Sequence, residues 1–119
     1  MMTFLFKNIL IVEDEMLIAM DAEESLESAG HGVVKVARTV SEALSILREQ
    51  VVDAALLDFN LPDGTSIPIA RWLEEHGVPY AIVTSQSPRH LFRENLPRSP
   101  IYQKPSDYAA IAQDLARAA

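Results

Sequence analysis

The chain has 119 residues, which is room for one domain, and 49% of them are apolar and 23% charged. This balance is typical of a globular protein with a buried core, and it excludes disordered, collagen-like and coiled-coil chains. The absence of cysteine excludes a disulfide scaffold, a thiolate zinc site and cysteine catalysis, and the formal net charge of −7 has the wrong sign for a nucleic-acid binder. No apolar run is long enough to cross a bilayer, and the first residues lack the features of a signal peptide. We therefore expect an acidic cytoplasmic domain with no membrane or nucleic-acid partner.

Five short apolar runs predict five β-strands. Several of them are continuous rather than alternating, which is typical of strands buried on both faces of a parallel sheet. The runs are 9–12 (ILIV), 33–36 (VVKV), 54–57 (AALL), 81–83 (AIV) and 101–102 (IY).

Helical patterns lie between these strands, as expected for a chain that alternates strand and helix. The predicted helices cover about residues 16–29 up to Gly30, 42–50 after Ser41 as the N-cap, 67–76 up to Gly77, and 106 or 107 to the end. The alternation predicts an α/β fold, with a doubly wound five-stranded parallel sheet and one domain over residues 1–119.

The stretch from Ser85 to Pro100 is the exception to this pattern. It holds three prolines, which leave only Arg89–Asn95 for a helix. We therefore expect a weak or shortened fourth helix there.

Ligands of an open α/β sheet bind at the carboxyl ends of its strands, and the residues at those ends are polar. Each of them alone has an ordinary structural role, because acids favour first helical turns and aspartate favours turns. Together they suggest a site, since clustered carboxylates repel one another unless a cation lies among them, and a hard cation such as Mg²⁺ prefers such oxygens. With a lysine and a hydroxyl added, the set suits phosphoryl transfer. The strand-end residues are Glu13, Asp14 and Glu15, then Asp58, then Thr84 and Ser85, and finally Lys104 and Pro105.

Four segments in this order resemble the receiver domain of two-component response regulators. The resemblance covers about residues 7–118 and implies the strand order 2-1-3-4-5. The segments are 9–15 (ILIVEDE), 56–64 (LLDFNLPDG), 81–85 (AIVTS) and 102–105 (YQKP).

The resemblance implies a role for each matched residue. Asp58 matches the phosphoacceptor, a carboxylate nucleophile. Glu13, Asp14 and Asp58, with the backbone carbonyl of Asn60, match the Mg²⁺ site. Three further matches are Lys104, which pairs with the acceptor and later with the phosphoryl group, Thr84, which turns toward that group, and Tyr102, at the aromatic switch position. The Lys104–Pro105 peptide bond is expected to be cis.

The function implied is that of a stand-alone receiver. Asp58 would take a phosphoryl group from a histidine kinase or a histidine phosphotransfer protein, with Mg²⁺ as cofactor, and the signal would pass to a downstream protein by contact. Such a domain catalyses its own phosphotransfer but is not a turnover enzyme. Two alternatives stay open: a degenerate receiver that binds partners without being phosphorylated, and a small haloacid-dehalogenase-type phosphatase. The latter family needs a second aspartate where this chain has Asn60.

Overall fold

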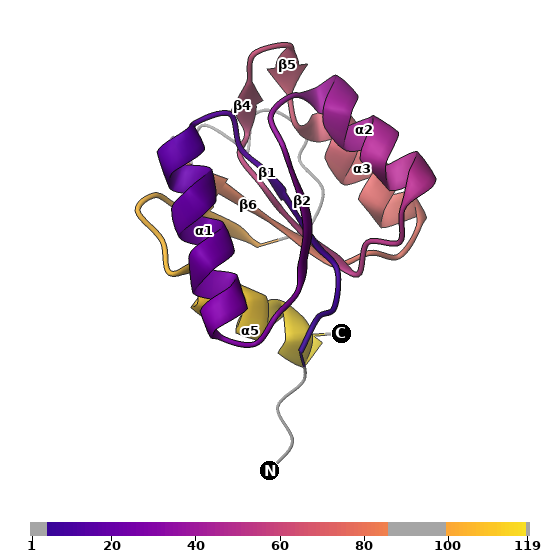
Figure 1. Cartoon of the computed structure of the whole chain (residues 1–119). Coiled ribbons are helices and arrows are strands. Elements are labelled where there is room, and N and C mark those ends of the chain that lie inside the picture. The colour runs from indigo at the N-terminus through magenta and orange to yellow at the C-terminus, as the bar shows by residue number, and fades with distance from the viewer. Residues whose placement is uncertain (1–4, 86–99, 119) are drawn as a thin grey trace.

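The computed structural model describes residues 5–85 and 100–118 and shows a parallel sheet between two pairs of helices (Figure 1). The strands of the sheet follow the order β2-β1-β3-β6-β7 and all pair in parallel, which confirms the predicted order 2-1-3-4-5. The strands are β1 (Ile9–Val12), β2 (Val33–Ala37), β3 (Ala54–Leu57), β6 (Tyr80–Thr84) and β7 (Ile101–Gln103). The helices are α1 (Met16–Ser28), α2 (Val40–Glu49), α3 (Ile67–Glu75) and α5 (Tyr108–Ala118).

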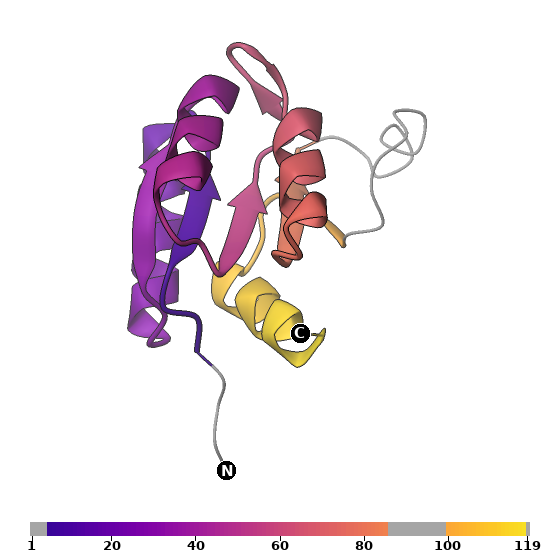
Figure 2. The ribbon, with the colours of Figure 1, turned by 90° about the vertical axis from the view of Figure 1, so that its right-hand side faces the viewer.

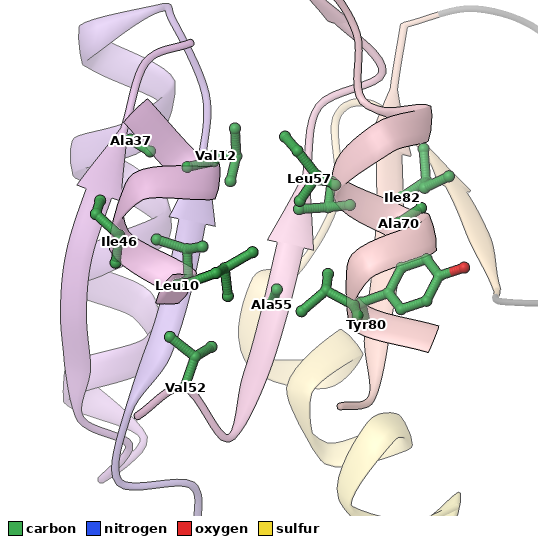
Figure 3. Close-up of a cluster of buried hydrophobic side chains, with 14 of the residues drawn as sticks. Leu10, Val12, Ala37, Ile46, Val52, Ala55, Leu57, Ala70, Tyr80 and Ile82 are labelled. Carbon is green, nitrogen blue, oxygen red and sulfur yellow. The ribbon is translucent and has the colours of Figure 1, made fainter. Parts of the chain in front are cut away.

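Two hydrophobic clusters, one on each face of the sheet, form the core. Leu10 and Val12 of β1 belong to the cluster covered by α2 and α3, whereas Ile9 and Ile11 belong to the one covered by α1 and α5. Figure 3 shows the first cluster, and Figure 2 shows the helices on either side of the sheet. Every residue of β1 and β3 is buried, which explains why these strands are continuously apolar in the sequence.

The helix boundaries agree with the prediction to within two residues, but the N-cap of α2 differs from the predicted one. This helix begins at Val40, and its N-cap is Thr39, whose side chain accepts a hydrogen bond from the Glu42 N–H at 3.0 Å. The prediction of Ser41 as the cap is therefore wrong, because Ser41 already lies in the first helical turn. Thr39 has the extended backbone that a cap requires.

A small hairpin that the sequence patterns do not predict follows Asp58. Its strands are β4 (Asn60–Leu61) and β5 (Gly64–Thr65), and they pair antiparallel. Gly64 has a φ of 139°, a backbone conformation that favours glycine. Leu61 is buried in the core, so the hairpin is fixed to the body of the domain.

The predicted fourth helix, Arg89–Asn95, lies outside the described residues. Among the described helices, the longest is α1 with 13 residues, and none could span a membrane.

Candidate functional site

Glu13, Asp58 and Lys104 each lie one residue past the carboxyl end of a strand, β1, β3 and β7 respectively. Backbone hydrogen bonds continue the ladder of the sheet at these positions, which aligns the strand ends at one edge. The bonds run from the Glu13 N–H to the Ala37 carbonyl (2.9 Å), from the Asp58 N–H to the Val12 carbonyl (2.9 Å) and from the Lys104 N–H to the Thr84 carbonyl (2.7 Å).

Three carboxylates meet at this edge. Oxygens of Glu13, Asp14 and Asp58 lie within 4.8 Å of one another. Glu13 is 4% exposed, which is unusual for a carboxylate and requires a compensating group. The Nζ of Lys104 supplies it, at 2.5 Å from Glu13 Oε1 and 3.5 Å from Asp58 Oδ1. The structure therefore brings together four residues from three distant segments of the sequence.

The electrostatics of this cluster favour an added cation. Burial, and then the charge of Glu13, raise the pKa of Asp58 to about 7, although Lys104 opposes the shift. Burial alone would lower the pKa of Lys104, but the hydrogen bond to Glu13 and the charges of Asp58 and Glu13 raise it above its usual value. The single ammonium of Lys104 therefore cannot neutralise both of the carboxylates that it contacts, Glu13 and Asp58.

The donor set fits Mg²⁺. Three carboxylates facing one ammonium leave two formal negative charges at the edge, and all of the acidic ligand atoms are the hard oxygens that Mg²⁺ prefers. Asn60 lies two residues past Asp58, in β4, with an exposed side chain. Its backbone carbonyl is the further ligand that the sequence predicts.

The hydroxyl residues at the edge have different surroundings. Thr84 ends β6 and is fully buried. Tyr102 lies on the neighbouring strand, paired with Val83, and its hydroxyl donates to Asp114 Oδ2 of α5 at 3.1 Å. Tyr102 is therefore tied to α5 rather than to the carboxylate cluster. The peptide bond between Lys104 and Pro105 is cis.

A groove opens beside Lys104. It has a volume of about 460 Å³ and lies between the start of α1 and the segment that joins β7 to α5. Its lining includes Glu15, Leu17 and Ser106, as well as Lys104 itself. Through Lys104, the groove borders the carboxylate cluster.

Three residues near the site were missed by sequence reasoning. Arg38 donates from Nη2 to the Asp14 carbonyl at 3.3 Å, Asp63 accepts from two N–H groups of α2, and Asp114 holds Tyr102. Each contact joins residues distant in sequence. A Pro-Asp-Gly run, as at 62–64, is typical of a turn, but it does not indicate which groups its aspartate contacts.

A doubly wound parallel sheet with a carboxylate cluster and a lysine at its carboxyl edge defines a receiver-type α/β domain. Comparison with known families agrees, since the model of the response regulator receiver domain matches residues 9–99. The chain belongs to this family.

Relatives and solved structures support the same assignment. The chain is 36% identical to the phyllosphere-induced regulator PhyR of Methylorubrum extorquens, a match that covers 92% of this chain and 42% of PhyR. It is 30% identical to the polar-differentiation response regulator DivK of Brucella ovis, over 58% of this chain and 55% of DivK. The solution structure of SdrG from Sphingomonas melonis Fr1 superposes with a TM-score of 0.74 at 36% identity, over 94% of this chain and 97% of that one. The chain thus spans about half the length of PhyR and of DivK, the two curated relatives.

Proposed function

We propose that residues 7–118 form one phosphoacceptor receiver unit of a two-component phosphorelay, with Asp58 as the residue that takes the phosphoryl group. The observation that carries the proposal is the position of the Asp58 carboxylate. It lies at the edge of the sheet, with Oδ1 3.5 Å from the Lys104 Nζ and a carboxylate oxygen within 4.8 Å of oxygens of Glu13 and Asp14.

The proposed reaction is an in-line displacement at phosphorus. A carboxylate oxygen of Asp58 forms a bond to phosphorus, while the bond from phosphorus to the imidazole nitrogen of the donor histidine breaks and that nitrogen keeps the electron pair. The product is an acyl phosphate on Asp58. Only the ionised carboxylate can attack. Because the pKa of Asp58 is about 7, the protonated and the ionised forms are both populated near neutral pH.

Each neighbouring residue has a task in this reaction. Lys104 lies where its ammonium can leave the Asp58 carboxylate and donate to a phosphoryl oxygen. Glu13 and Asp14, with Asp58 and the Asn60 carbonyl, would hold Mg²⁺, which neutralises charge on the phosphoryl oxygens when it is bound. The Thr84 hydroxyl would turn toward the phosphoryl group after transfer.

The partners follow from the family. A histidine kinase or a histidine phosphotransfer protein would supply the phosphoryl group in the cytoplasm, and the output would be contact with a downstream protein. The PhyR structure from Bartonella quintana, 29% identical to this chain, is described as an anti-anti-sigma factor. By this likeness we propose a protein of the sigma-factor regulatory kind as the downstream class.

The proposal is tested by phosphorylation with acetyl phosphate and Mg²⁺, followed by intact-mass spectrometry. We expect one added phosphoryl group, which hydroxylamine removes because the linkage is an acyl phosphate. Asp58→Asn should abolish the addition, while Asp107→Asn, a matched change outside the cluster, should retain it. A modification that survives Asp58→Asn would contradict the assignment.

The same measurement separates the two alternatives. A degenerate receiver would take up no phosphoryl group, and a phosphatase would release inorganic phosphate continuously from the donor. The phosphatase also needs a carboxylic acid two residues past the nucleophile. Asn60 stands there, and its amide cannot donate a proton as a general acid.

A further inference from the structure

The junction between β2 and α2, residues 38–41, touches both loops that carry the metal-site residues. One loop follows β1 and holds Asp14, and the other is the β4–β5 hairpin, which holds Asn60. Figure 1 shows the hairpin at the top of the molecule, above the sheet and close to the start of α2. The junction belongs to neither loop, so its contacts with them are tertiary.

The contact with the hairpin is a carboxylate on the start of a helix. Asp63 Oδ1 accepts from the Val40 N–H at 2.8 Å, and Asp63 Oδ2 accepts from the Ser41 N–H at 3.1 Å. These N–H groups belong to the first turn of α2 and have no partner within the helix. The two bonds lower the pKa of the Asp63 carboxyl, so it is ionised at neutral pH and also complements the dipole of α2.

The contact with the loop after β1 is made by Arg38. Its Nη2 donates to the Asp14 carbonyl at 3.3 Å. The backbone of Arg38 is itself held, because its N–H donates to Glu42 Oε2 at 3.5 Å in the first turn of α2. Arg38 therefore connects the start of α2 to the loop that holds Asp14.

We propose that Arg38 and Asp63 form a clamp across the start of α2, which sets the distance between Asp14 and the Asn60 carbonyl, so that both are positioning residues for the metal site. The inference rests on the proposed function, since it concerns the same site. Neither residue touches the metal. Each acts through the loop that it holds.

The physical reason for a clamp is the geometry of Mg²⁺. This ion requires nearly octahedral coordination at about 2.0–2.1 Å, so small loop displacements weaken binding. The hairpin pairs only two residues from each strand, which is too little to be stable alone. Asp63 lies three residues past Asn60, in the turn between β4 and β5, and its hydrogen bonds to α2 fix this turn. Residues that orient ligands in this way typically change metal affinity by about 10- to 100-fold when they are replaced.

The first test compares Asp63→Ala with Thr39→Ala. Both remove a cap from the start of α2, but only Asp63 is joined to the hairpin. We expect Asp63→Ala to weaken Mg²⁺ binding by about tenfold, the lower end for such residues. Thr39→Ala should lower stability in urea yet leave the Mg²⁺ affinity unchanged. Calorimetric titration of the metal-free proteins with MgCl₂ gives the affinity, and the amide resonance of Asn60 reports its position.

Asp63→Asn separates positioning from charge. It removes the same charge as Asp63→Ala but keeps one acceptor oxygen, so the clamp predicts an intermediate affinity. Equal losses in the two variants would show that the charge alone matters and would overturn the role of Asp63. The role of Asp63 would also be overturned if Thr39→Ala lost as much Mg²⁺ affinity as Asp63→Ala, or if Asp63→Ala lost none.

For Arg38→Ala, electrostatics and the clamp predict opposite changes in the affinity for Mg²⁺. Removing a cation near the carboxylates would strengthen Mg²⁺ binding by electrostatics alone. The clamp predicts weaker binding, by about threefold because one exposed hydrogen bond is lost, together with a shift of the Asp14 and Glu15 amide resonances. Tighter binding would overturn the role of Arg38.

The wild-type titration distinguishes failure of the clamp from failure of the proposed function. If the wild type binds Mg²⁺, and Asp14→Asn abolishes binding while Asp63→Ala and Arg38→Ala do not weaken it, only the clamp is wrong. If the wild type shows no binding, both the metal site and the clamp are wrong.

Discussion

Asp58 lies in an environment that is unfavourable for its ionised form. Its carboxyl is partly buried beside Glu13, and both effects oppose ionisation. Lys104 offsets them only in part, because it lies closer to Glu13 than to Asp58. Without a metal ion, the folded protein therefore loses stability when Asp58 ionises.

This imbalance predicts that Asp58→Asn stabilises the metal-free protein at pH 8. The pKa of Asp58 is about 7 in the folded state and near 3.8 in the unfolded state, so folding favours the protonated form. The stability that this form provides is present below pH 3.8 and is lost as the pH rises to about 7. Urea unfolding should show a gain for Asp58→Asn that is largest above pH 7 and shrinks toward pH 4. A gain that does not vary with pH would contradict the explanation.

His31 predicts a pH dependence of the opposite sign. It is buried, its ring stacks on Phe6, and its Nδ1 accepts a hydrogen bond from the Phe6 N–H at 3.0 Å, which requires the neutral ring. Burial lowers the pKa of His31 from 6.5. The stability that the neutral ring provides is therefore complete above pH 6.5 and is lost as the pH falls below it.

The measurement for His31 is best made in the Asp58→Asn background, because Asp58 titrates in the same range. We expect the free energy of unfolding to fall between pH 7 and pH 5. His31→Gln should be less stable at pH 7 but should show a smaller fall. The same fall with and without His31 would assign the effect to other groups.

At the scale of the elements, Gly32 sets the close approach of the chain before β1 to the start of β2. Its N–H donates to the Phe6 carbonyl at 2.9 Å, and its carbonyl accepts from the Ile9 N–H at 2.8 Å. A Cβ at this position would lie 2.1 Å from the Lys7 carbonyl oxygen, which is backbone and cannot move alone.

Gly32→Ala should therefore destabilise the protein by about 2 kcal/mol or more, as overpacking does. Gly77→Asn is the control, since Gly77 has a φ of 67° with open space around it and asparagine tolerates that conformation. Thermal unfolding should show a large loss for the first variant and a small one for the second. Equal losses would indicate that lack of space at Gly32 is not the cause.

The elements also show what the sequence can and cannot predict. The strands β1, β3 and β6 were predictable because burial on both faces makes them continuously apolar, and the site was predictable because parallel strand ends meet at one edge. Thr39 and Ser41 are both good caps two residues apart, and backbone geometry decides between them. The hairpin has too few residues for any periodic pattern, and the contacts of Arg38, Asp63 and Asp114 depend on tertiary structure.

At the scale of the whole molecule, the link from Tyr102 to Asp114 joins the sheet to α5. Thr84 and Tyr102 lie on neighbouring strands, so a change at the proposed phosphoryl site can reach α5 through them. Residues 86–99, which join β6 to β7, lie outside the described part of the chain. The Tyr102 contact offers a readout within the described part of the chain.

We therefore predict that activation breaks the bond between Tyr102 and Asp114. If Tyr102 must leave Asp114 when Thr84 turns toward a phosphoryl mimic, Asp114→Ala should lower the beryllofluoride concentration needed for half-saturation in the presence of Mg²⁺. We expect a change of about threefold, because this exposed bond is at the low end of about 0.5–1.5 kcal/mol. The effect should vanish in the Tyr102→Phe background, which lacks the hydroxyl, and amide resonances of α5 can follow the titration. The same change in both backgrounds would mean that Asp114 acts by its charge and that the hydroxyl plays no part in the switch.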